Sequence, residues 1–166
     1  MKNTPDEITN SEDILDSRNI QKRYDYLTGR IQDAFSDAGR DSVDFESCGE
    51  KWEEGGRLDS ILGRLVKMEL LDESELEEWK TIKTVFIDQF SNNSGWQYGM
   101  GFLRDSYMDE DWVENECKDL GYLSSMNNEL PSFIYNNING QGILEDLQQD
   151  YTTVDFDGVD YWYRQC

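Results

Sequence analysis

Carboxylates are the residues of this chain whose number and spacing could do chemistry. The 166 residues include 36 Asp and Glu against 15 Lys and Arg, a formal net charge of −21. Six carboxylates fall within the eleven residues from Asp109 to Asp119, where Lys118 is the one basic residue. As a helix rising about 1.5 Å per residue, this segment would carry a carboxylate about every 2.7 Å. Duplex DNA carries a charge about every 1.7 Å, so the helix would approach DNA's charge density without reaching it.

The residue types exclude several other kinds of site. The chain has no histidine, which removes the commonest general base, the commonest metal ligand and the Ser/His and Cys/His nucleophiles. Cys48, Cys117 and Cys166 are widely spaced and are expected to be reduced thiols rather than a disulfide framework or zinc site. Residues 155–158 lack the alternating acids of a calcium loop, so a turn is favoured there. We expect no cofactor and no metal, and a protein that binds rather than catalyses.

The charge is unevenly distributed along the chain. Residues 1–36 hold seven acids and five bases, residues 37–100 fifteen and seven, and residues 101–166 fourteen and three, giving −2, −8 and −11. Such charge opposes compact folding by self-repulsion and exceeds what solubility requires. Five Trp, nine Tyr and seven Phe nevertheless favour a folded core. The spread of the excess indicates an extended acidic binding face rather than a detachable tail.

The densest run of acids is predicted to lie on a helix of about residues 110–120. Asp109 is its expected N-cap and Gly121 its stop. An apolar arc recurs at helical spacing and would face the core. Glu116 falls within this arc, so it either lies at the rim of the core or argues against the helix. The arc consists of Trp112, Val113, Cys117 and Leu120.

A β-hairpin is predicted at the C-terminus. Residues 151–156 and 159–164 are rich in aromatic and β-branched residues, and Asp157-Gly158 between them suits a type I′ turn. A lone hairpin is only marginally stable in water, so it must pack on the helices before it. The nearest of these is a helix over residues 143–149, with Ile143, Leu144 and Leu147 facing inward.

The predicted fold is α+β, mainly helical, with this Asp-Gly hairpin at its end. Residues 1–16 are expected to be loose, and helices are expected over about 17–35, 58–71 and, capped by Asp72 or Ser74, up to about residue 90. Glycine-rich stretches break the pattern at 37–57 and 91–101. The expected organisation is an N-terminal helix (1–36), a linker (37–57) and an acidic body (58–166), or a single domain throughout.

Two sets of acids are candidates for partner binding. The main set belongs to the acidic helix, the last helix and the hairpin, whose polar faces could merge into one field: Asp109, Glu110, Asp111, Glu114, Asp119, Glu145, Asp146, Asp150, Asp157 and Asp160. A secondary patch crowds the start of the helix after Asp72: Glu73, Glu75, Glu77 and Glu78. Stabilisation by the positive end of that helix is the competing explanation for this patch.

Two blocks of sequence support a resemblance to a known group. Residues 12–18 (EDILDSR), and residues 95–162 with GWQYG, LRDSY, the acidic helix and DYTTVDFDGV, resemble small acidic antirestriction proteins of phages and mobile elements. The second block covers about 40% of the chain. Its closing helix and hairpin are similar to the C-terminal module of the ArdA-type antirestriction family, whose members are elongated acidic mimics of B-form DNA.

The resemblance implies an inhibitor, encoded by a phage or mobile element, that blocks the basic nucleic-acid cleft of a host defence protein. A restriction-modification complex is the first expected target and a CRISPR effector the second. No direct binding to nucleic acid is expected, because the protein itself is strongly acidic. Two other readings stay open. One is a phage adaptor that recognises its partner through exposed aromatic residues, and the other is a hydrolase that uses a carboxylate pair.

Location and assembly are further expectations. No signal peptide opens the chain and no apolar run approaches about 18 residues, so a cytoplasmic protein without membrane contact is expected, in the host cell if phage-encoded. A homodimer is also expected. The first helix is nearly balanced in charge, and the two glycine-rich breaks would allow elements to be exchanged between copies.

Overall fold

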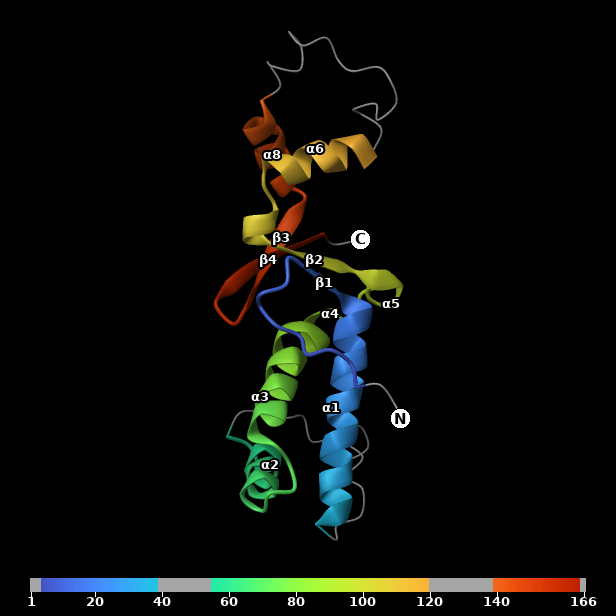
Figure 1. Cartoon of the computed structure of the whole chain (residues 1–166), viewed down its shortest axis with the longest axis vertical. Helices are drawn as coiled ribbons and strands as arrows, with labels where there is room; N and C mark the ends of the chain where they lie inside the picture. The colour runs from blue at the N-terminus through green and yellow to red at the C-terminus, as the bar shows by residue number, and fades with distance from the viewer. Residues whose placement is uncertain (1–3, 39–54, 120–138, 165–166) are drawn as a thin grey trace. The chain divides into compact units, whose positions relative to one another are not determined.

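The computed structural model describes residues 4–38, 55–119 and 139–164, which divide into two compact units (Figure 1). The helical unit comprises residues 1–8 and 18–92, and the sheet unit comprises residues 9–17 and 93–166. The chain therefore passes between the units after Ile8, Ser17 and Asn92. The expected boundary at residues 37–57 is not where the structure divides, because the helices on either side of that stretch belong to the same unit.

The helical unit is built from α1 and a second run of helices. Its elements are α1 (Ser17–Asp37), α2 (Arg57–Lys67), α3 (Glu73–Ile82), the π-helical stretch η1 (Lys83–Ile87) and α4 (Asp88–Phe90). Asp72 caps α3 as predicted, its carboxylate accepting hydrogen bonds from the backbone N–H groups of Ser74 and Glu75. The Ser74 hydroxyl also donates a hydrogen bond to this carboxylate. Together these hydrogen bonds lower the pKa of Asp72, and the one from the hydroxyl has the largest effect.

Apolar residues at helical spacing form the core side of α1. Ile20, Leu27, Ile31 and Phe35 are buried there, and Tyr24 is half-buried. The Tyr24 ring stacks on Trp79 of α3 with 5.9 Å between centroids, and the Trp79 indole N–H donates to the Thr28 hydroxyl over 3.0 Å. These contacts join α1 to α3 across a long gap in sequence.

Two helical boundaries differ from the sequence prediction. The helix predicted over 58–71 ends at Lys67, and Glu69 just beyond it adopts the left-handed region with φ 59°, which does not continue a helix. The helix predicted from Asp72 to Phe90 does continue to Phe90 but contains the π-helical stretch η1. Phe86 in this stretch is buried, as are Trp79 and Ile82 of α3.

Residues 5–8 are held by contacts with α1 and α3, although this segment was predicted to be loose. Ile8 is buried, and the carbonyl of Pro5 accepts a hydrogen bond from Arg23 of α1 over 3.0 Å. The Glu78 carboxylate holds the same segment, since it accepts from the Ile8 N–H over 3.2 Å. Polar composition suggested disorder here, but two side chains distant in sequence supply the hydrogen bonds that order it.

The sheet unit contains a four-stranded antiparallel sheet in the order β1-β2-β4-β3. The strands are β1 (Ile14–Asp16), β2 (Gly101–Arg104), β3 (Tyr151–Phe156) and β4 (Val159–Arg164). The predicted hairpin is confirmed residue for residue, with Asp157 at φ 51° and Gly158 at φ 79° in its turn. The sequence prediction missed β1 and β2, which are too short to show an alternating pattern and pair over more than eighty residues.

The remaining elements of the sheet unit are short helices: α5 (Trp96–Gly99), the 3-10 turn η2 (Asp105–Tyr107), α6 (Glu110–Asp119) and α8 (Gly140–Gln148). One face of the sheet is lined by the buried side chains Leu15, Phe102, Val154, Phe156, Tyr161 and Tyr163. The other face carries Leu103, Tyr151 and Trp162, which pack against α6 and α8. The α+β class predicted from sequence is confirmed.

A buried ion pair in the helical unit predicts a specific stability loss. Arg23 donates to Glu78 through two nitrogens, at 2.9 and 2.7 Å, and the side chains are only 9% and 12% exposed. These hydrogen bonds raise the pKa of Arg23. Glu78→Gln leaves that cation without its counter-charge and is expected to lower the free energy of unfolding by about 2–4 kcal/mol. Urea denaturation followed by circular dichroism measures this loss.

The matched control is Glu75→Gln, which removes the exposed ion pair with Arg30 at 3.3 Å. Its cost should be about 0.2–1 kcal/mol, because Arg30 is 43% exposed and water screens the pair. Equal losses from the two substitutions would contradict the assignment of Glu78 as the buried partner.

Candidate acidic binding surface

The acidic helix α6 is fixed by its cap and by its apolar side. The Asp109 carboxylate accepts a hydrogen bond from the Trp112 N–H over 2.9 Å, which confirms the predicted N-cap. Val113 is buried with Met108 and Leu144 in a cluster that also contains Trp112 and the thiol of Cys117. The predicted stop at Gly121 and the arc residue Leu120 lie outside the described residues.

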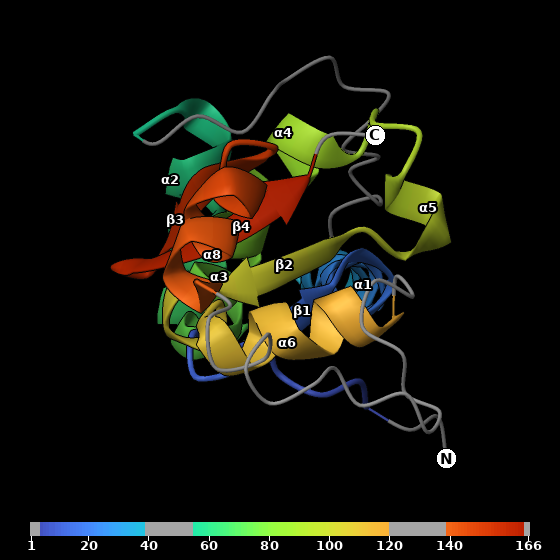
Figure 2. The ribbon, with the colours of Figure 1, turned by 90° about the horizontal axis from the view of Figure 1, so that it is seen from above.

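The last helix, α8, packs against α6 through the same cluster, and the two helices are neighbours in both views (Figure 1 and Figure 2). The Asn139 side chain caps α8 by accepting from the Gly142 N–H over 3.1 Å. A Cβ at residue 142 would lie 2.6 Å from the Asn139 side chain, so glycine lets the cap close. Leu144 is buried and Ile143 and Leu147 are half-buried, as predicted from their spacing.

This packing brings together the first part of the predicted site. α6 and α8 press their apolar sides together, so their carboxylates lie on the sides that face water. The cap residue Asp109, Asp111 of α6, Glu145 and Asp146 of α8, and Asp150 before β3 are exposed, and Glu114 is half-buried. Glu110 and Asp119 are the first and last residues of α6.

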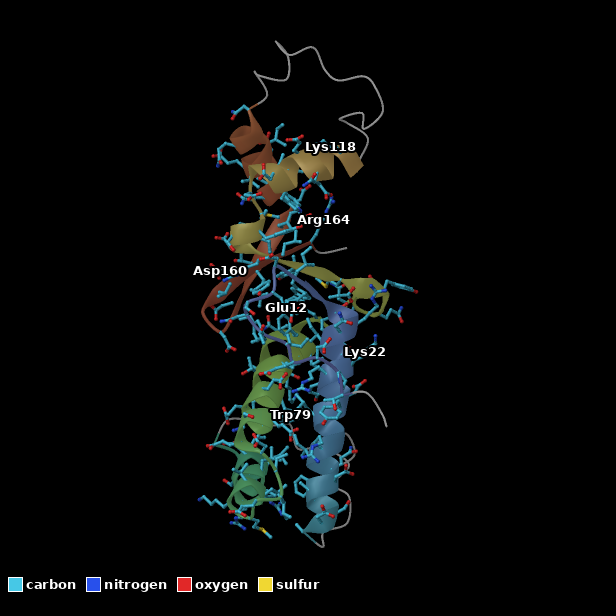
Figure 3. The ribbon with its side chains drawn as sticks, in the orientation of Figure 1. Glu12, Lys22, Trp79, Lys118, Asp160 and Arg164 are labelled. Atoms are coloured by element: carbon cyan, nitrogen blue, oxygen red, sulfur yellow. The ribbon has the colours of Figure 1, made fainter. Side chains whose placement is uncertain are left out.

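The second part of the predicted site lies at the tip of the hairpin. Asp157 is in the turn, and Asp155 lies directly opposite Asp160 across the two strands. Six residues of strand span about 20 Å, so these carboxylates are separated from α8 by the length of β3. Figure 3 shows Asp160 near the turn end of β4 and Arg164 at the other end of the same strand. The acids thus form two exposed groups on one unit rather than one unbroken patch.

Sequence reasoning missed three acids that lie between or beside these groups. The Asp105 carboxylate accepts a hydrogen bond from the Trp162 indole N–H over 2.8 Å, which places it beside the middle of β4. Glu12 and Asp13 are exposed and join the sheet through their backbone carbonyls, which accept from the Tyr161 hydroxyl and the Arg104 N–H. No local pattern could have placed them, because each contact spans more than fifty residues.

The acids also affect the tyrosines of the sheet. Burial raises the pKa of Tyr161, and the negative charges of Glu12 and Asp13 raise it further. Burial likewise raises the pKa of Tyr151, with Glu116 adding to the effect. Glu116 is half-buried on α6, which fits the interpretation that it lies at the rim of the core.

The two units differ in how their acids are balanced. In the helical unit, ion pairs join Glu75 to Arg30, Glu77 and Asp59 to Lys80, Glu78 to Arg23, and Asp88 to Lys83. Three of the four residues proposed as a secondary acidic patch are thus paired with cations, and Glu73 alone of the four has no such pair among the described residues. Ion pairing within the helical unit accounts for three of these acids, and the secondary patch stays a prediction.

The sheet unit has few cations to balance its acids. Lys118 pairs with Glu114, and Arg164 pairs with Asp150 over 3.5 Å. Ten exposed carboxylates of this unit form no ion pair with any described Lys or Arg: Glu12, Asp13, Asp105, and seven more, namely Asp109, Asp111, Glu145, Asp146, Asp155, Asp157 and Asp160. We call these last seven residues the acidic surface.

Two other kinds of feature are absent from the part of the chain that the structure describes. There, no group of three or more Cys, Asp or Glu side chains is arranged to hold a metal ion. None of the described helices has an apolar stretch long enough to cross a lipid bilayer.

The chain matches no protein-family model, no curated protein and no solved structure. The resemblance to ArdA-type antirestriction proteins therefore stays a prediction.

The opposed carboxylates of the hairpin predict an unusual gain in stability. Asp155 and Asp160 face each other across β3 and β4, and like charges at such positions repel. Asp160→Asn is expected to stabilise the sheet unit by about 0.2–1 kcal/mol at low salt and less at high salt. Thermal unfolding at two salt concentrations measures both effects.

The control is Asp150→Asn on the same unit, which removes a carboxylate paired with Arg164. This substitution should not stabilise the sheet unit, because it removes the attraction between Asp150 and Arg164 together with the repulsion between Asp150 and other acids. A gain equal to that of Asp160→Asn would mean that only total charge matters, and not the pairing across the hairpin.

Proposed function

We propose that this protein inhibits a host DNA-binding defence enzyme by occupying its basic nucleic-acid cleft as an acidic mimic of DNA. A restriction-modification complex is the first candidate target and a CRISPR effector the second. The observation that supports this most is the acidic surface, seven exposed carboxylates without a cation partner among the described residues.

The physics of such binding follows from the charges. Phosphate-binding grooves attract counterions and release them when an acidic ligand enters, so binding is strong at low salt and weakens steeply as salt rises. The hairpin alone separates the two groups of acids by about 20 Å, the length of about six base steps in one strand of B-form DNA. Asp105 lies between the groups, which makes the field more continuous along that length.

A second candidate function is an adaptor that recognises its partner through aromatic side chains. Tyr98 on α5 is 78% exposed and Tyr107 in η2 is 37% exposed, both in the sheet unit. Exposed tyrosines are common anchors of protein interfaces. An interface built on them would keep most of its affinity at high salt, which separates this function from mimicry.

The test starts with capture of partners from host lysate at low and high salt, using the whole protein as bait. Mimicry predicts a nucleic-acid-binding defence enzyme that is retained at low salt and released at high salt. Added duplex DNA should compete for the captured enzyme, because both ligands fill one groove.

A charge-removal variant tests which acids are responsible. Asp111→Asn, Glu114→Gln, Asp119→Asn, Glu145→Gln and Asp146→Asn together are expected to weaken binding by orders of magnitude and to flatten its salt dependence. Each single substitution should change little, because exposed charges contribute only about 0.2–1 kcal/mol each. Isothermal titration against the captured enzyme at several salt concentrations measures both effects.

The matched control removes the same charge from the helical unit, at the exposed residues Asp6, Asp25, Asp33, Asp37 and Glu69. It should retain nearly all affinity. If both five-residue variants bind as the original protein does, mimicry by the acidic surface is wrong. One sharp loss from a single substitution, with the others silent, would instead indicate a catalytic group or a specific buried contact.

A further inference from the structure

The strand β3 forms one edge of the sheet. The strand order β1-β2-β4-β3 places it outermost, hydrogen-bonded to β4 on one side. On its other side, no backbone hydrogen bond joins it to any residue that the structure describes. Such an edge presents N–H and C=O groups that a further strand can pair with.

The register shows which groups these are. Phe156 and Val159 flank a two-residue turn, where the paired residues exchange both of their backbone hydrogen bonds. Alternate residues of an antiparallel strand point their N–H and C=O to opposite sides. Thr152, Val154 and Phe156 therefore point toward β4, whereas Tyr151, Thr153 and Asp155 point outward from the sheet.

This edge lacks most of the features by which proteins protect their edge strands. β3 has six residues and contains no proline, lysine or glycine, and its pairing with β4 shows no bulge. Thr152, Thr153 and Asp155 are exposed. The carboxylate of Asp155 is the one charged side chain on the strand.

The charge beside the edge indicates what could pair with it. Asp155 points to the same side of the sheet as Asp160, and Asp157 lies in the adjoining turn. In an antiparallel partner strand, the residues opposite Thr153 and Asp155 would project on this acidic side while their backbone N–H groups point at β3. Lysine or arginine at these alternate positions would be attracted, and a second copy of this acidic strand would be repelled.

We infer that the outer edge of β3 takes an extended basic segment of the partner protein as a fifth strand. The inference rests on the proposed function for the sign of the partner's charge, but it adds a contact that charge alone does not require. Backbone pairing would fix the position of the partner along the hairpin, whereas the acidic surface attracts any basic groove.

The first experiment titrates the full chain with a ten-residue peptide of alternating lysine and valine and follows amide hydrogen exchange by NMR. Exchange at the outward amides of Tyr151, Thr153 and Asp155 should slow by about tenfold or more, since each gains or borders a new hydrogen bond. The inward amides of Thr152, Val154 and Phe156 are the internal control and should not change.

Two modified peptides separate backbone pairing from charge. Methylation of the backbone nitrogen of every lysine removes the N–H groups that would point at β3. This change should weaken binding of the peptide by about tenfold or more. N-methylation of every valine removes N–H groups that point away and should leave the affinity unchanged. Both peptides carry the same charge as the original.

The outcomes distinguish this inference from the proposed function. If all three peptides bind with the same affinity and hydrogen exchange at the outward amides does not slow, the edge is not used. Mimicry by the acidic surface would still stand. If binding of the lysine-valine peptide does not weaken with salt, the electrostatic attraction that the proposed function requires is absent, whether or not the edge is used. If the outward amides are already protected in a concentration-dependent dimer, a second copy occupies the edge and the inference is wrong.

A variant of the protein gives an independent test. Thr153→Pro removes the central outward N–H without removing a hydrogen bond to β4, and proline is tolerated at such edge positions. It should lose about tenfold in affinity for the lysine-valine peptide with little change in circular dichroism. If the variant fails to fold, the peptide series on the original protein decides the question.

Discussion

The constraint that shapes this structure is self-repulsion, because a chain of net charge −21 must still bury a core. Repulsion of this size favours the unfolded chain, so the fold must offset it with apolar burial and with well-placed cations. The two units meet this constraint differently. The helical unit joins some of its acids to lysines and arginines in ion pairs, and the sheet unit relies on aromatic packing.

In the helical unit, the Arg23–Glu78 pair shows how far a single cation can contribute. Arg23 reaches Glu78 of α3 and the carbonyl of Pro5, and Glu78 in turn accepts from the Ile8 N–H. One ion pair thereby joins α1, α3 and the N-terminal segment. Because the pair is almost buried, each partner needs the other, and the hydrogen bonds around it satisfy what burial would otherwise leave unpaired.

In the sheet unit, aromatic residues hold the strands while the carboxylates stay outside. Phe102, Tyr161 and Tyr163 are buried on one face of the sheet, and Trp162 on the other face packs with the α6–α8 cluster. The Phe102 and Tyr163 rings lie 5.8 Å apart across two paired strands. Large rings bury much surface per residue, so few of them are enough to keep the strands together despite unpaired acids. Because its carboxylates stay exposed despite their mutual repulsion, the sheet unit retains a surface suited to a strongly basic partner.

The amino-acid sequence by itself determined the local elements of this protein. The hairpin, its Asp157-Gly158 turn, the Asp109 and Asp72 caps and the inward residues of α1, α6 and α8 all follow from turn chemistry, capping and periodicity over a few residues. The sequence also located most of the exposed acids, because their density needs no folding to be seen. Only the tertiary structure decided that β1 and β2 complete the sheet and that Glu78 is a buried partner rather than a surface acid. It likewise decided that Asp105, Glu12 and Asp13 lie beside the hairpin. The physical reason is that strand pairing and buried ion pairs join residues more than fifty positions apart, where local patterns carry no information about which partner is chosen.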